Sequence, residues 1–106
     1  TRLHAQVCSG LADTNRILIL YSLAEHSYNV SELAEELQLA QPSVSRHLKI
    51  LRERNMVTAD RKGQSVIYSL SDKRIIEALD ILRAFLADQL ESQVELAKSA
   101  SDLIQA

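Results

Sequence analysis

The sequence predicts a mainly α-helical fold with one small β-hairpin, and three observations lead to this class. Apolar residues recur at helical spacing in two adjacent segments between Asn29 and Leu51, with a short turn at residues 39–41. After Asn55 the pattern changes to the period of two that is typical of strands, on both sides of Gly63. Neither glycine nor proline follows Gly63, so the chain ends in a long helical pattern. Together these features predict a winged helix-turn-helix of roughly five helices in a single domain, residues 1–106.

Two helices are expected before this core pattern. The segment from Arg2 to Gly10 places Leu3 and Val7 one turn apart, as in a short amphipathic helix. Asp13 can cap the next helix, which should run to about His26. The apolar residues of this helix point in nearly all directions, so we expect it to be the central and most buried helix.

The helix-turn-helix is expected over residues 31–54. Ser31 is a candidate N-cap for its first helix, and Pro42 suits the first turn of its second helix because proline lacks the N–H that would find no helical partner there. In the second helix the apolar residues Val44, Leu48 and Leu51 form one narrow stripe. The opposite face should therefore meet water or a ligand through Ser45, Arg46 and Lys49.

The hairpin is expected over residues 57–70, with Gly63 supplying the positive φ of a tight turn. Its second strand should be buried on one face, since Val66, Tyr68 and Leu70 alternate with other residues. Arg61 and Lys62 lie at the tip, where burial is least expected.

The last helix is expected over residues 72–104, and its apolar stripe is too long for so small a domain to cover. We therefore expect a homodimer that forms through the first and last helices. The alternative is a last helix that docks only against the first helix of its own chain. The candidate dimer-interface residues are Leu3, Val7, Leu79, Leu82, Leu86 and Leu90.

A second helix with hydroxyl and basic groups outward can enter the major groove of double-stranded DNA. Arg46 suits guanine, and Gln41 suits adenine. His47, at the edge of the apolar stripe, has two open interpretations, a half-buried packing residue or a phosphate contact. The candidate DNA contacts are Gln41, Ser43, Ser45, Arg46, His47, Lys49, Arg61, Lys62 and Gln64.

A net charge of −2 at pH 7 is unfavourable for binding DNA, but the charge is unevenly distributed along the chain. Residues 46–74 carry eight basic residues and three acidic ones, whereas the segments on either side are acidic. Positive charge is therefore concentrated where the reading helix and hairpin are expected, and local charge governs phosphate contact.

Three stretches, LADTNRILIL, SELAEELQLAQPSVSRHLKILRERNMV and ADRKGQSVIYSL, resemble the ArsR/SmtB family of bacterial winged-helix repressors in order and spacing. The resemblance covers about Leu11 to Leu70, and Thr14 stands where the family usually has proline. It implies a homodimer that binds an operator and leaves it when an inducer, often a metal ion, binds.

The family's common metal ligands are absent from this sequence. No cysteine occurs at residues 29–33, and no histidine follows His47. We therefore predict no cofactor, and no zinc or arsenic sensor of the usual kind. His4 and Cys8, one turn apart, could ligate an ion together with acidic residues of the last helix, or Cys8 could be a redox switch. We favour Cys8 as a small core residue.

Composition excludes several other classes of protein. One cysteine excludes an intrachain disulfide and fits a reducing, cytoplasmic setting. No apolar run approaches the ~20 residues of a membrane span, and no signal peptide is visible, although a chain that begins at Thr1 leaves an upstream segment open. No catalytic constellation is present, so we do not expect an enzyme. The alternative to a DNA-binding repressor is a winged helix used for protein–protein contact.

Overall fold

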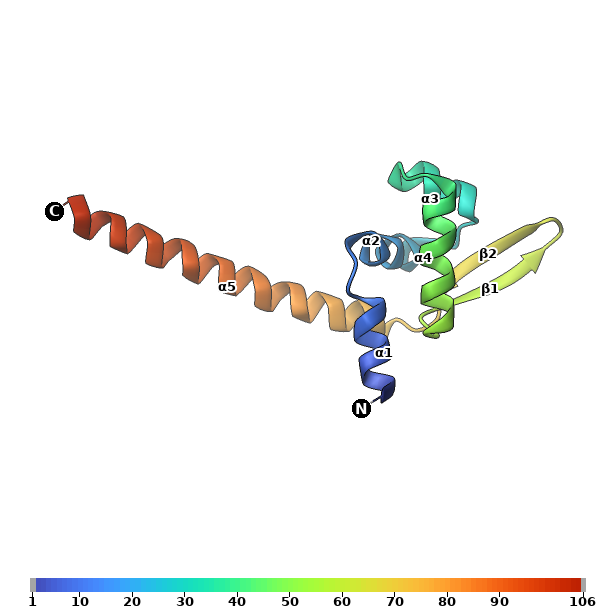
Figure 1. The fold of residues 1–106 in the computed structure, drawn as a ribbon, viewed down its shortest axis with the longest axis horizontal. Coiled ribbons are helices and arrows are strands. Elements are labelled where there is room, and N and C mark those ends of the chain that lie inside the picture. Colours follow the sequence, from blue (N-terminus) through green and yellow to red (C-terminus); the bar gives the residue numbers. More distant parts are fainter. Residues whose placement is uncertain (1, 106) are drawn as a thin grey trace. The chain divides into compact units, whose positions relative to one another are not determined.

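The computed structural model describes residues 2–105, which form five α-helices and one two-stranded sheet (Figure 1). The elements are α1 (Arg2–Gly10), α2 (Thr14–Glu25), α3 (Val30–Leu37), α4 (Gln41–Glu53), β1 (Val57–Lys62), β2 (Ser65–Leu70) and α5 (Arg74–Gln105). The chain divides into two compact units, one up to Ile76 and one from Glu77 onward. The predicted class and order of elements are confirmed. No described helix is long and apolar enough to cross a membrane.

Helix α2 begins where the sequence predicts, because Asp13 caps it. The Asp13 carboxylate accepts the backbone N–H groups of Asn15 at 2.8 Å and Arg16 at 3.2 Å. Burial raises the pKa of this carboxyl, but the two N–H groups and the nearby His47 and Arg16 outweigh that effect, so the pKa lies below its ordinary value.

Helix α3 is capped differently from the prediction. Asn29, not Ser31, is the N-cap, and it forms a reciprocal capping box with Glu32. The Glu32 backbone N–H donates to the Asn29 side chain at 2.8 Å, and the Asn29 N–H donates to the Glu32 carboxylate at 2.9 Å. Asn29 is the more favourable N-cap because Glu32 stands three positions later. The two side chains together satisfy two unpaired N–H groups, whereas Ser31 alone would satisfy one.

Two residues with positive φ end the helices of the helix-turn-helix. Gln38, at φ 54°, ends α3, and the Leu39 N–H then donates to the Ala34 carbonyl at 2.9 Å. Asn55, at φ 60°, ends α4, and the Met56 N–H donates to the Leu51 carbonyl at 2.9 Å. Both are Schellman-type closures, which stop a helix within one residue. The turn accordingly occupies residues 38–40, one residue earlier than predicted.

The core of the first unit joins α2, α3, α4 and the start of β1. On α4, the predicted stripe of Val44, Leu48 and Leu51 is fully buried. Helix α2 is central, as predicted, since it contacts α3, α4 and β2. It is not buried on all sides, because Leu18 is 45% exposed. The other buried apolar residues of this unit are Ile19, Leu20, Leu23, Leu33, Ala34, Met56 and Val57.

The hairpin pairs Val57 with Leu70 and Lys62 with Ser65, and Gly63, at φ 64°, opens its two-residue turn. A one-residue bridge extends the sheet, since Tyr28 and Tyr68 exchange backbone hydrogen bonds of 3.1 and 2.8 Å. The expected alternation of burial in β2 is wrong: residues 66–70 are all half-buried. Strand β2 contacts α2 and α3 as well as β1, so its residues are partly covered along the strand.

Helix α5 starts at an aspartate. The Asp72 carboxylate accepts the backbone N–H of Arg74 at 2.8 Å and also pairs with its guanidinium, with Nη2 2.7 Å from Oδ2. Hydrogen bonds from the Arg74 side chain, and then from its backbone, lower the pKa of Asp72 to about 2 although burial opposes them.

The low pKa of Asp72 predicts a pH-dependent contribution to stability. Because the folded pKa lies below the ordinary value of 3.8, the contribution is present above about pH 4 and is lost as the pH falls through about 2. We expect Asp72→Asn to lower Tm near neutral pH, and the difference from wild type to shrink steadily below about pH 4. Thermal unfolding followed by circular dichroism checks this. Arg74→Ala should show the same trend, and a difference independent of pH would contradict the assignment.

Candidate nucleic-acid interface

The outward face of α4 carries the polar and basic side chains that the sequence predicts. Ser45, Arg46 and Lys49 are exposed, while Ser43 is half-buried. This follows from the burial of Val44, Leu48 and Leu51, because residues on one stripe of a helix turn the residues between them away from the core. Arg46 therefore stands in the first two turns of α4 with its guanidinium accessible.

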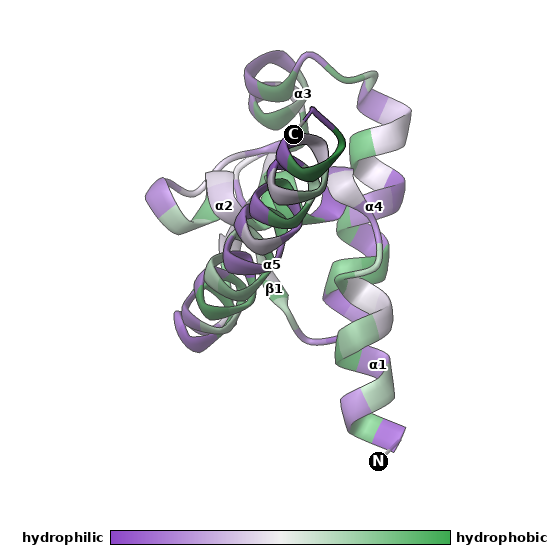
Figure 2. Cartoon of the chain, turned by 90° about the vertical axis from the view of Figure 1, so that its left-hand side faces the viewer, coloured by the Kyte–Doolittle hydropathy of each residue, from purple (hydrophilic) through white to green (hydrophobic). Residues whose placement is uncertain are grey.

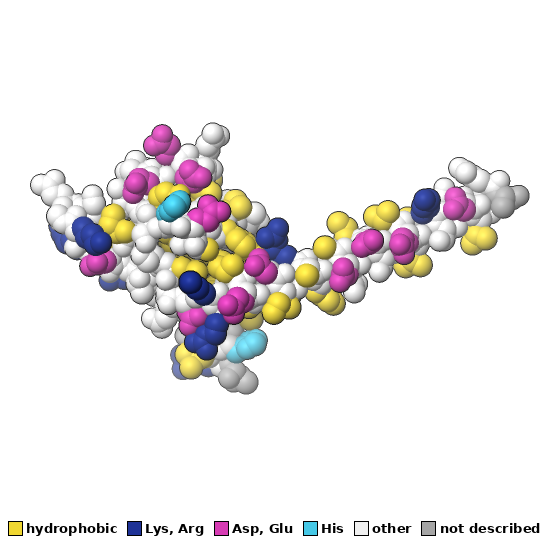
Figure 3. Space-filling model, turned by 180° about the vertical axis from the view of Figure 1, so that it is seen from behind, with side chains coloured by type: hydrophobic (Ala, Val, Ile, Leu, Met, Phe, Trp, Pro, Cys, Tyr) yellow, Lys and Arg dark blue, Asp and Glu magenta, His cyan; other side chains and the backbone are white. Residues whose placement is uncertain are grey.

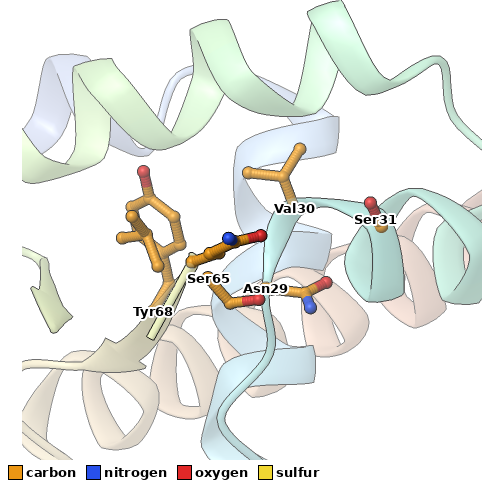
Figure 4. Close-up of a pocket in the computed structure, with 7 residues that line it drawn as sticks. Asn29, Val30, Ser31, Ser65 and Tyr68 are labelled. Atoms are coloured by element: carbon orange, nitrogen blue, oxygen red, sulfur yellow. The ribbon is translucent and has the colours of Figure 1, made fainter. Parts of the chain in front are cut away.

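The start of α4 is joined to the start of α3 and lies beside a surface pocket. The Gln41 side-chain amide donates to the Ser31 hydroxyl at 3.2 Å. Ser31, with Asn29 and Val30, lines a pocket completed by β2 residues and the predicted contact Gln64 (Figure 4). The beginnings of both helices of the helix-turn-helix and the hairpin therefore adjoin one polar, hydroxyl-rich surface. The sequence does not place these segments together, since Ser31 is 10 residues from Gln41 and 33 residues from Gln64.

The tip of the hairpin is exposed, as predicted. Arg61, Lys62 and Gln64 all face solvent. The surface around α3 has the opposite charge: Glu32, Glu35 and Glu36 are exposed. Burial, and then Glu36, Glu25 and Glu32, raise the pKa of Tyr28, which shows that this negative charge is felt at the α2–α3 link. Within this unit, six of the ten basic residues lie on α4, at its carboxyl end or on the hairpin, whereas α3 carries only acidic charge.

The His47 side chain is directed toward Asp13 and Arg16 and not toward solvent. Its side chain is only 16% exposed. Its Nδ1 is 3.5 Å from Arg16 Nη1, and its Nε2 is 3.9 Å from Asp13 Oδ1. Of the two predicted roles, this position supports packing, and we leave His47 out of the proposed DNA contacts. Sequence reasoning missed its partner Arg16, and no signal could have revealed the pair, because 31 residues separate them.

The candidate metal and redox residues lie on α1. His4 and Cys8 are both exposed, so the interpretation of Cys8 as a small core residue is wrong for the single chain. Helix α1 is amphipathic but short, and it buries only Gly10. Among residues 2–105, no three His, Cys, Asp or Glu side chains lie close enough together to hold a metal ion. A redox role for Cys8 stays a prediction.

The candidate dimer residues are mostly uncovered. Leu3 is 76% exposed, and Leu82, Leu86 and Leu90 are 52–64% exposed, while Leu79 is already buried within the single chain. Figure 2 shows apolar and polar residues side by side along α1 and α5, and Figure 3 shows apolar side chains along much of α5. A second apolar line, which sequence reasoning missed, adds Ile81, Phe85 and Leu96.

Comparison with known proteins agrees with this geometry. The family model described as "Bacterial regulatory protein, arsR family" matches residues 13–59. The chain is 39% identical over 79 residues to the HTH-type transcriptional regulator NmtR of Mycobacterium tuberculosis, covering 72% of this chain and 66% of NmtR. It is 35% identical over 75 residues to the arsenical resistance operon repressor of Bacillus subtilis, covering 70% of this chain and 71% of that protein.

A solved structure shows the same fold. The crystal structure of NolR from Sinorhizobium fredii superimposes with a TM-score of 0.72 at 33% identity, covering 79% of this chain and 84% of that one. The chain spans only 66% and 54% of the first two curated relatives, NmtR and KmtR. The family match at residues 13–59 includes the whole helix-turn-helix and ends inside the first strand of the hairpin.

Proposed function

Because this chain belongs to the ArsR family of bacterial regulatory proteins, we propose that it is a transcriptional repressor that binds operator DNA as a homodimer. The observation that carries the proposal is the outward face of α4, where Arg46 and its polar neighbours stand exposed on a helix anchored by its opposite side. An α-helix fits the major groove, whose base edges present distinct donor and acceptor patterns.

A dimer is part of the proposal because one helix-turn-helix reads only one half-site. Two recognition helices must lie about one DNA turn, ~34–36 Å, apart to meet successive major grooves. The exposed apolar residues of α1 and α5 supply a surface that a second copy can cover, and burial of each such leucine contributes about 1.5–3 kcal/mol. An inducer that changes this packing would change the spacing of the recognition helices.

The experiment that tests the proposal is selection of DNA duplexes from a randomised pool by the full chain. We expect enrichment of a two-fold symmetric sequence, and retention of that duplex over random DNA of equal length by about 10³-fold or more. Sedimentation should show two chains per duplex. A protein–protein module would enrich no sequence, and that result would refute the proposal.

Arg46 is expected to read a base. Its guanidinium can form two hydrogen bonds to guanine O6 and N7, so Arg46→Ala should cost about 1–3 kcal/mol of binding to the selected duplex and relax the preference at one position. Fluorescence anisotropy on single-base variants of the duplex measures this. An equal loss on selected and random DNA would instead assign Arg46 to a phosphate.

The hairpin tip is expected to supply affinity without sequence information. Replacing Arg61 and Lys62 together with alanine should weaken binding to all duplexes and reduce the slope of log K against log salt by about two units per subunit. Lys98→Ala, which removes one exposed positive charge from α5, is the control for loss of a lysine outside the hairpin. An unchanged slope in the double variant would place the tip away from DNA.

A further inference from the structure

Arg16 makes contacts that neither the core nor the DNA-reading surface requires. From α2, its Nε donates to the Gly10 carbonyl at 2.8 Å and its Nη2 donates to the Ser9 carbonyl at 3.1 Å. Both carbonyls belong to the last turn of α1, and that of Ser9 also accepts the Ala12 N–H at 3.2 Å. One guanidinium therefore caps the carboxyl end of α1, and its fork shape lets it hold two carbonyls at once.

The same guanidinium reaches α4, the recognition helix of the proposed function. Its third nitrogen, Nη1, is 3.5 Å from His47 Nδ1. In the tautomer that carries its proton on Nε2, His47 Nδ1 accepts a hydrogen bond from this guanidinium, which only donates. His47 Nε2 lies 3.9 Å from Asp13 Oδ1. His47 follows Arg46 directly in α4. The chain of contacts thus runs from the end of α1, through Arg16, to the residue beside the principal base-reading candidate.

A second contact fastens α1 to the end of α4. Gly10 is buried, and a Cβ atom at this position would lie 2.7 Å from Met56 Sδ and 3.8 Å from Arg54 Cγ. A side chain at position 10 would therefore require the Met56 side chain to move. With Gly10 against the end of α4 and Arg16 reaching its middle, the last turn of α1 is held at two separate points. A shift of α1 must break or move the Arg16 contacts.

We propose that Arg16 is a positioning residue that couples α1 to the recognition helix, so that a change at α1 reaches Arg46 through Arg16 and His47. The inference rests on the proposed function, because it concerns how a DNA-reading helix is set. Helix α1 has exposed apolar residues and is a candidate dimer helix, so coupling through Arg16 would join assembly, or an inducer acting on α1, to DNA recognition. Such coupling is reciprocal: DNA bound at α4 must also stabilise the arrangement at α1.

The first test is a double-mutant cycle on DNA binding by the full chain. Arg16→Gln removes the fork, and His47→Leu removes the acceptor. Each should weaken binding to the duplex selected from a randomised pool about tenfold, and binding to random DNA less than about twofold. The double variant should be no weaker than either single variant, because both changes break one path. Additive losses, or equal losses on both DNAs, would overturn the inference.

The second test reads α1 directly by amide hydrogen exchange. The N–H groups of Leu11 and Ala12 bond to carbonyls of the last turn of α1. In wild type, saturating selected duplex should slow exchange over residues 2–12, whereas in Arg16→Gln bound to the same duplex it should not. The matched control is Arg2→Gln, another arginine loss near α1, which should behave as wild type. Equal slowing in Arg16→Gln would overturn the inference.

Two further comparisons keep the outcomes distinct. If Arg16→Gln does not fold, as judged by circular dichroism, Arg16→Lys replaces it, because a single ammonium keeps the charge but cannot hold both carbonyls and His47. If wild type enriches no duplex, the proposed function itself fails. If wild type binds its selected duplex and the Arg16 variants bind both DNAs as wild type does, the function stands and the coupling through Arg16 is refuted.

Discussion

The buried stripe of α4 is the constraint on which the rest of this molecule depends. Val44, Leu48 and Leu51 have no exposed surface, so the rotation of α4 about its own axis is set by the core. Once that rotation is set, Arg46 and Lys49 must point outward. The reading surface is therefore a consequence of packing, and a change in the core that rotated α4 would redirect every side chain on its outer face.

Backbone geometry also determines where the helices α3 and α4 end. Gln38 and Asn55 take positive φ, and each lets a backbone N–H reach back to a carbonyl five residues earlier. The first closure positions α4 relative to α3, and the second directs the chain from α4 into β1. The Tyr28–Tyr68 bridge then fastens the hairpin to the α2–α3 link. These backbone hydrogen bonds, together with the contact of the Ser27 and Ser69 hydroxyls at 2.7 Å, place the hairpin beside the helix-turn-helix.

Charge is separated along the molecule in a way that its net value hides. In a chain with net charge −2, half of the twelve basic residues lie on α4, at its carboxyl end or on the hairpin, whereas acidic residues gather around α3 and along α5. Phosphate contact depends on charges within about a Debye length, ~8–10 Å, so the local charge of α4 and the hairpin matters more to it than the net charge of the chain. The acidic surface around α3 would disfavour DNA there, which favours an approach through α4 and the hairpin tip.

Local pattern was sufficient to determine much of this protein from its sequence. The stripe on α4, the Asp13 cap, the glycine turn of the hairpin and the exposed basic tip were all predictable, since each depends on residues within one turn or one hairpin. Contacts between distant residues were not. The Arg16–His47 contact, the approach of Gly10 to Met56 and the neighbourhood of Gln41, Ser31 and Gln64 arise only when separate elements pack together. The exposure of Cys8 was likewise decided by the fold, because a residue on a helix becomes buried only where another element packs against it.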